Sequence, residues 1–161
     1  MKTNTTITEI THEDIVDLLS TALYGGNIFG VDYDSNEYRK LPNLDKYKCI
    51  EDKCAELLLN GKSITIYDRY AEDEEDFHGG LYHSWDFGDE TMDYTITLSD
   101  IKKGLQKCID GKFKVNDGCD EEIPYIRKCV ADLIDRENGN LDLFEAQDIL
   151  QVIIFGKIIY G

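Results

Sequence analysis

The sequence predicts a single α+β domain over residues 1–161, in which about five helices pack on a small, largely antiparallel sheet. Several segments repeat apolar residues at intervals of three and four, as amphipathic helices do, and two short segments alternate apolar and polar residues, as strands do. Similar helix–glycine–strand patterns occur at the two ends of the chain. A chain of 161 residues is long enough to bury about two-thirds of its unfolded surface.

Capping residues and glycines set the expected helix boundaries. Thr11 is a candidate N-cap of the first helix, which Gly25–Gly26 are expected to end. Ser99 is the candidate cap of a later helix that Gly111 ends, and Pro124 suits a first helical turn. The predicted helices are therefore Thr11–Leu23, Asp45–Leu59, Ser99–Ile109, Pro124–Asp135 and a C-terminal helix that begins at the capping-box pair Asp142 and Glu145.

Two strands are predicted, Ser63–Arg69 and Met92–Leu98. In the first, Ile64 and Ile66 alternate with Thr and Tyr residues, and the second shows the same period of two. We expect the two strands to form an antiparallel pair, joined by a long acidic and aromatic loop over about residues 70–91.

The two ends of the chain resemble each other. Residues 10–30 align with residues 141–161 without a gap, so that Asp17 meets Asp148 and Gly25 meets Gly156. Any helix–glycine–strand unit would share this pattern. The alternative is a pseudo-symmetric fold whose terminal units pack side by side.

Charge and composition exclude several classes of function. The chain has 33 Asp and Glu against 17 Lys and Arg, a net charge of −16 and a pI near 4.4, so direct binding to nucleic acid or to an anionic membrane is not expected. No apolar run approaches the ~18 residues of a membrane span, and the polar N-terminus does not resemble a signal peptide. The five cysteines are an odd number without a C-x-x-C pair. We expect a soluble cytoplasmic protein with reduced thiols.

The segment from Tyr70 to Ile101 concentrates the negative charge. It contains ten acids, no Lys or Arg, and the one Trp of the chain among several other aromatic residues. Because carboxylates pair with Arg and Lys while aromatic faces bind cations, this combination indicates a surface for a basic partner. The alternative is that the aromatic residues pack the loop onto the sheet while the acids face water. The predicted partner-binding residues are Glu72, Asp73, Glu74, Glu75, Asp76, Phe77, Tyr82, Trp85, Asp86, Asp89 and Glu90.

No catalytic residue, cofactor or metal ligand is predicted. The sequence contains none of the common phosphate-binding, dinucleotide-binding, nucleophile-elbow or zinc-protease motifs. His78 and His83 lie near Asp76 and Asp86, which leaves a metal-dependent enzyme open as an alternative.

A second class of function is a small-molecule binder that sequesters an anionic signal such as a nucleotide. Such a ligand requires a basic pocket. Lys103 and Lys107 are spaced to share one helix face, although such lysines commonly form just the solvated side of a helix. The dense basic group to which they belong is Lys102, Lys103, Lys107, Lys112 and Lys114.

Four blocks of the sequence carry a resemblance to a known group of proteins. They are "ITHEDIVDLLSTALYGG", "ELLLNGKSITIYD", "YTITLSDIKKGLQKCI" and "EAQDILQVIIFGKIIYG". In this order they resemble the small acidic proteins carried by phages, plasmids and integrated elements of Gram-positive gut bacteria, some of which are described as anti-CRISPR proteins that inhibit Cas9. The resemblance implies a non-enzymatic inhibitor in the cytoplasm of a bacterial host. It carries no residue-level motif.

These observations lead to one functional hypothesis. We expect a mobile-element-encoded anti-CRISPR protein that binds a CRISPR nuclease in stoichiometric amounts. Such nucleases hold nucleic acid in positively charged channels, so an acidic surface can act as a nucleic-acid mimic there. Binding is expected to weaken as salt rises, since exposed charge pairs are screened over about 8–10 Å.

Overall fold

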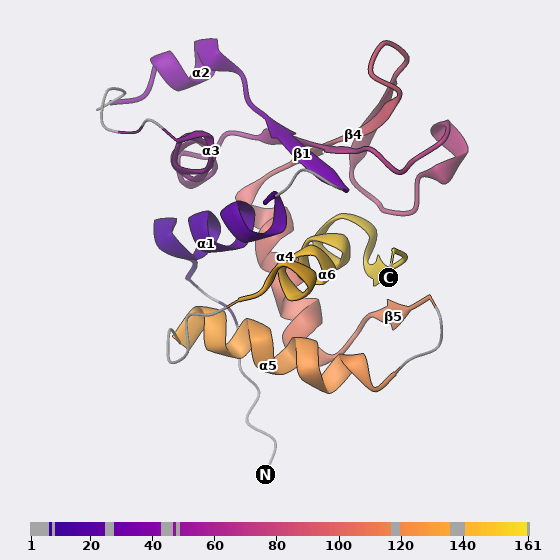
Figure 1. Cartoon of the computed structure of the whole chain (residues 1–161). Helices are drawn as coiled ribbons and strands as arrows, with labels where there is room; N and C mark the ends of the chain where they lie inside the picture. Colours follow the sequence, from indigo (N-terminus) through magenta and orange to yellow (C-terminus); the bar gives the residue numbers. More distant parts are fainter. Residues whose placement is uncertain are drawn as a thin grey trace.

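The computed structural model describes residues 7, 9–24, 28–42, 47, 49–116, 120–135 and 141–160. These described residues form the predicted α+β architecture, with six helices and a four-stranded antiparallel sheet. In Figure 1 the sheet forms one layer at the top of the molecule and most of the helices lie beneath it, so that one sheet face is covered and the other is open. Among the described residues, no helix is both long and apolar enough to cross a membrane.

Helices and strands are interspersed along the chain. The helices are α1 (His12–Ala22), α2 (Ser35–Arg39), α3 (Ile50–Leu59), α4 (Leu98–Asp110), α5 (Glu122–Asp135) and α6 (Leu143–Phe155), with a 3₁₀ turn η2 (Glu74–Asp76). The strands are β1 (Phe29–Asp32), β2 (Ile64–Asp68), β3 (Tyr82–Asp86), β4 (Thr91–Ile96), β5 (Lys114–Val115) and β6 (Lys157–Ile158). The main sheet has the order β1-β2-β4-β3, and β5 and β6 form a separate parallel pair.

The predicted strand pair is confirmed. Strands β2 and β4 lie antiparallel, with Ile66 opposite Tyr94 and Tyr67 opposite Asp93. The expectation of an uninterrupted loop over residues 70–91 is wrong, because this segment contains both η2 and the edge strand β3. Strand β3 escaped prediction because its two inward residues, His83 and Trp85, are amphipathic, so the sequence lacks a clear apolar alternation.

Most helix boundaries follow the predicted caps. Thr11 caps α1 through a capping box with Asp14, and α4 ends at Gly111. The cap of α4 is Thr97 rather than Ser99, because the hydroxyl of Thr97 accepts from the backbone N–H of Asp100 while the Asp100 carboxylate accepts from that of Thr97. Helix α3 begins at Ile50, later than expected, and the predicted stop at Gly25–Gly26 lies outside the described residues.

The apolar side chains that are buried form one cluster between the sheet and the helices. Helix α6 lies at its centre: from Glu145 to Phe155 every residue except Asp148 is buried. It contacts α1, α4 and α5. The two terminal helices therefore do pack together, but the strands that follow them join different sheets, β1 the main sheet and β6 the small one.

Candidate functional site

The open face of the main sheet carries polar and charged residues on all four strands. Along β4, Met92, Tyr94 and Ile96 are buried in the core, so the intervening Asp93 and Thr95 face outward. The strand register continues this alternation across the sheet, because residues directly opposite each other point to the same side. The outward residues include Asp32 on β1, Thr65 and Tyr67 on β2, Asp93 on β4 and Asp86 on β3.

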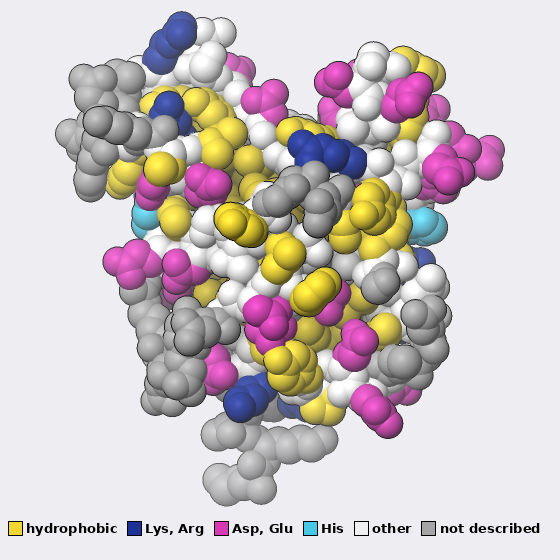
Figure 2. Space-filling model, viewed as in Figure 1, with side chains coloured by type: hydrophobic (Ala, Val, Ile, Leu, Met, Phe, Trp, Pro, Cys, Tyr) yellow, Lys and Arg dark blue, Asp and Glu magenta, His cyan; other side chains and the backbone are white. Residues whose placement is uncertain are grey.

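These residues line a hollow of about 620 Å³ on the outer side of the sheet, called here the acidic hollow. Figure 2 shows the notch at the top of the molecule, between the lobe that carries α2 and the lobe that carries the β3–β4 hairpin, where carboxylates gather. One cationic side chain, Arg69, lines it as well. The five carboxylates of the lining are Asp32, Asp86, Asp89, Glu90 and Asp93.

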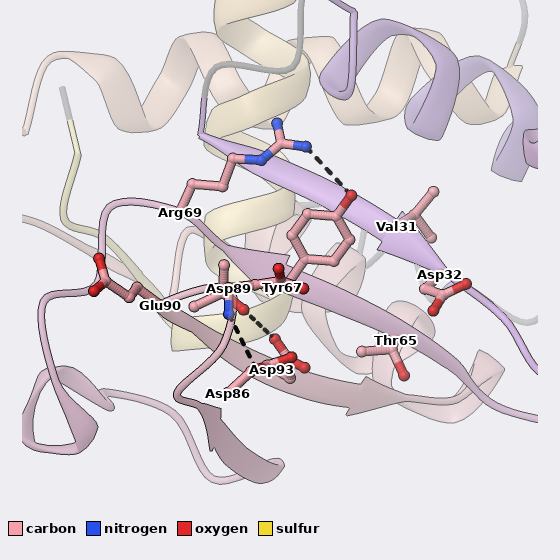
Figure 3. Close-up of a pocket in the computed structure, with 10 residues that line it drawn as sticks. Val31, Asp32, Thr65, Tyr67, Arg69, Asp86, Asp89, Glu90 and Asp93 are labelled. Atoms are coloured by element: carbon pink, nitrogen blue, oxygen red, sulfur yellow. Dashed lines mark hydrogen bonds between the residues drawn. The ribbon is translucent and has the colours of Figure 1, made fainter.

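Arg69 lies against Tyr67 in the lining of the acidic hollow. Its guanidinium carbon is 5.0 Å from the centre of the Tyr67 ring, and Nη2 donates a hydrogen bond of 3.2 Å to the Tyr67 hydroxyl (Figure 3). The ring of Tyr67 extends over Gly30 of β1, where there is no side chain to obstruct it. The hollow thus binds one guanidinium, that of Arg69, through a cation–π contact with the Tyr67 ring and a hydrogen bond to the Tyr67 hydroxyl.

Hydrogen bonds fix two of the carboxylates. Asp86 Oδ1 accepts from the backbone N–H groups of Gly88 at 2.9 Å and Asp89 at 3.2 Å, which closes the turn after β3. Asp93 Oδ1 accepts from the Thr91 hydroxyl at 2.7 Å. Partial burial raises the pKa of Asp93, and the negative charges of Asp86, Asp89 and Asp32 raise it further. The carboxylates therefore act on one another as a single negatively charged region.

The β3–β4 hairpin carries two exposed aromatic residues near these acids. Phe87 in the turn is 80% exposed, and Tyr82 at the start of β3 is 75% exposed. Trp85 lies on the inward side of β3, opposite the buried Met92, is half-buried and makes an edge contact with Phe87 at 6.4 Å between ring centres. Glu90, at the rim of the hollow, has a φ of 53°, which is uncommon for a residue with a side chain. This left-handed residue completes the four-residue turn, residues 87–90, that joins β3 to β4.

The structure divides the acids among the predicted partner-binding residues into two groups. Asp86, Asp89 and Glu90 line the acidic hollow, whereas the acids from Glu72 to Asp76 form or flank the η2 turn and do not line it. Within that turn Asp73 and Asp76 form a capping box, so part of this charge serves local structure. The acids before the hairpin are thus a separate surface, called here the η2 acids: Glu72, Asp73, Glu74, Glu75 and Asp76.

Phe77 is the predicted binding residue whose contacts are mainly internal. It is half-buried and stacks on His83, with 3.5 Å between ring centres, and on Tyr94 of the core, at 5.7 Å. For this residue the structure favours the alternative considered above, in which an aromatic side chain packs the segment onto the sheet.

Sequence reasoning missed Asp32, Tyr67, Arg69 and Asp93 as members of the site. Asp32 ends β1, just beyond the helix–glycine–strand pattern predicted for residues 10–30, and only strand pairing brings it near the hairpin. Asp93 and Tyr67 could have been found, because they are the outward positions of two correctly predicted strands and lie directly opposite each other.

The histidines of the acidic segment are engaged in ring contacts. His83 stacks on Phe77 and its Nδ1 lies 3.1 Å from the Leu81 carbonyl oxygen, and His78 makes an edge contact with Phe155. No group of three or more His, Cys, Asp or Glu among the described residues could hold a metal ion. Burial raises the pKa of the Cys54 and Cys108 thiols to about 12, which disfavours the reactive thiolate.

Comparisons of the chain with protein-family models, with curated proteins and with solved structures found no match.

Proposed function

We propose that the protein is a non-enzymatic inhibitor that binds the nucleic-acid-binding site of a basic host protein, a CRISPR nuclease being the partner expected. The observation that carries this proposal is the acidic hollow, in which five carboxylates line the open sheet face beside an exposed aromatic hairpin. A face of this kind is unsuited to nucleic acid itself, because it would repel the phosphates.

The chemistry of such a partner fits the hollow. Nucleases that separate or hold nucleic acid strands do so with arginines and lysines in a positively charged channel. Carboxylates accept paired hydrogen bonds from a guanidinium in the same plane, as phosphate oxygens do. The Tyr67 ring holds Arg69 by a cation–π contact, and the exposed Phe87 and Tyr82 offer further aromatic faces for such contacts.

Inhibition through this surface is stoichiometric. The inhibitor occupies cationic groups that nucleic acid would otherwise contact, so one molecule blocks one enzyme and no bond is made or broken. The on-rate of binding should depend strongly on salt, since complementary charge steers the encounter.

Two variants of equal charge test where the partner binds. In the first, the five carboxylates of the acidic hollow are changed to amides: Asp32→Asn, Asp86→Asn, Asp89→Asn, Glu90→Gln and Asp93→Asn. In the second, the η2 acids are changed to amides: Glu72→Gln, Asp73→Asn, Glu74→Gln, Glu75→Gln and Asp76→Asn. Both variants lose five negative charges, and Asn keeps the acceptor that the turns at Asp73 and Asp86 use.

Affinity capture from host lysate at low salt, with bound proteins identified by mass spectrometry, should recover a nucleic-acid enzyme with the wild type and with the η2 variant. The hollow variant should not recover it, and about 0.5 M salt should release it, because the Debye length is then only a few ångströms. The purified enzyme should be inhibited at equimolar ratio. If the hollow variant captures the same enzyme as the wild type does, the proposed site is wrong. An empty wild-type lane would count against the function itself.

A further inference from the structure

A second cavity lies where α4 crosses the last turn of α6, and it shares no lining residue with the acidic hollow. Its volume is about 280 Å³, near the lower end for small-molecule sites. The loop that joins η2 to β3 forms one wall, and the last turn of α6, with the buried Ile153, Ile154 and Phe155, forms the floor. Lys103 and Lys107, one turn apart on α4, line the side opposite the loop.

Lys103 and Lys107 differ from the other described lysines in lining this cavity. Neither forms an ion pair with any other described residue, although the net charge of the protein is −16. Asp100 also lines the cavity, but its Oδ2 already accepts from the backbone N–H of Thr97 at 2.8 Å and from the Thr97 hydroxyl at 2.9 Å. The face of α4 that Lys103 and Lys107 were predicted to share lines this cavity.

The glycine loop supplies a second, independent feature. The backbone N–H groups of His78, Gly79 and Gly80 donate to no other described residue. Gly79 lies directly on the last turn of α6, since a Cβ there would stand 2.0 Å from the Ile154 carbonyl oxygen. Successive unpaired backbone N–H groups in a glycine-rich loop are a common way to bind phosphate oxygens.

We propose that this cavity binds a small phosphomonoester of about the size of a nucleoside monophosphate. The phosphate lies between the ammonium groups of Lys103 and Lys107 and the glycine loop, and the rest of the ligand lies over the last turn of α6. The carbonyl end of α6 and the overall negative charge oppose an anion, so the affinity is modest, with a Kd of about 0.1–1 mM. The site does not depend on the proposed inhibition, because no residue belongs to both surfaces.

The experiment is an NMR titration of the ¹⁵N-labelled full chain with adenosine 5′-monophosphate, with adenosine and inorganic phosphate as comparison ligands. The amide signals of Gly79 and Gly80 should shift and saturate with the nucleotide. Adenosine and phosphate should each bind at least about tenfold more weakly, since each lacks half of the contacts. The paired variant Lys103→Gln/Lys107→Gln should weaken nucleotide binding by at least about tenfold, through loss of two charge-assisted hydrogen bonds.

The matched control is Lys112→Gln/Lys114→Gln, which removes two lysines of the same basic group that do not line the cavity and should leave binding unchanged. Because Lys107 lies beside Gly156 at the end of α6, changing it could also disturb the fold. Lys103→Gln alone changes only an exposed side chain, so it separates loss of binding from loss of folding. Absence of saturation up to about 10 mM, or equal affinity in the Lys103→Gln/Lys107→Gln variant, would overturn the site. Phosphate that binds as tightly as the nucleotide would overturn the ligand class in favour of free phosphate.

Discussion

The ring of Tyr67 covers Gly30 so closely that a Cβ atom at Gly30 would stand 2.1 Å from the ring atoms Cε2 and Cζ. The two residues are direct partners in the β1–β2 register, so the absence of a side chain on one strand provides the space for the aromatic ring on the next. This pairing sets the position of Tyr67, and through its hydroxyl that of Arg69, on the floor of the acidic hollow.

Gly30→Ala should therefore destabilise the protein by about 1–3 kcal/mol, because the added methyl group forces the ring of Tyr67 to move. Chemical denaturation measures this cost. In a Tyr67→Ala background the same substitution should cost much less, and the double-mutant cycle isolates the contact. Equal costs in the two backgrounds would show that Gly30 is needed for a reason other than Tyr67.

Arg69→Gln should tighten binding to the basic partner. The hollow then retains five carboxylates without an internal cation, so we expect affinity to rise by about two- to fivefold, as for one interaction between partly exposed charges. Calorimetric titration with the captured enzyme measures this. Arg39→Gln, on the exposed end of α2, changes the net charge equally and is the control. Weaker binding by Arg69→Gln would mean that Arg69 itself contacts the partner.

Gln151 holds the segment after α6 in place. Its Oε1 accepts from the backbone N–H groups of Ile159 at 2.9 Å and Tyr160 at 2.7 Å, and its Nε2 donates to the Tyr160 carbonyl at 3.0 Å. Gln151→Met should cost about 2–4 kcal/mol of unfolding free energy, since three backbone groups lose their partner. Gln147→Met is the matched control, because buried Gln147 makes one long hydrogen bond of 3.5 Å to the Ala22 carbonyl. Similar losses for the two variants would contradict this account.

Asp148 makes stability depend on pH. Burial, together with the charges of Glu122, Asp142 and Glu145, raises its pKa from 3.8 to about 7. In the folded state the proton is held more tightly than in the unfolded state, so this residue lowers stability as pH rises from about 4 to about 7, and the full cost is present above that range.

Asp148→Asn should therefore raise the melting temperature at pH 8 by roughly 2–4 °C, corresponding to about 1 kcal/mol after allowance for the partial exposure of the carboxylate. At pH 4 the two proteins should melt together. Thermal denaturation followed by circular dichroism across this range is the measurement, with Glu121→Gln as an exposed control. A variant whose advantage does not grow with pH would exclude the assigned role of Asp148.

Local sequence patterns were sufficient to predict the helices and strands that bury one clearly apolar face. Strands β2 and β4 were found from alternation, and the caps Thr11 and Asp142 from their side chains and their partners three residues on. The edge strand β1 was anticipated only as the short strand of the N-terminal helix–glycine–strand pattern, and its pairing was not. The edge strand β3 was missed because its residues are at most partly buried and show no such alternation.

The acidic hollow could be predicted only in part for the same reason. Charge along the chain identified Asp86, Asp89 and Glu90, but it also selected the η2 acids, which the fold places elsewhere. Only the pairing of β1 with β2 adds Asp32 to the site. Charge density along a sequence shows where acids are abundant, whereas register determines which of them share a surface.

The burial of α6 also has a consequence for how the protein folds. The helix that fills the core contacts α1, α4 and α5, and its contact with α1 joins segments that are far apart in sequence. Closing so long a loop is slow, so we expect a high contact order to limit the folding rate. A fragment that lacks residues 141–160 should remain sensitive to proteases, since its sheet has no core helix to pack on, and folding should be completed only when α6 docks.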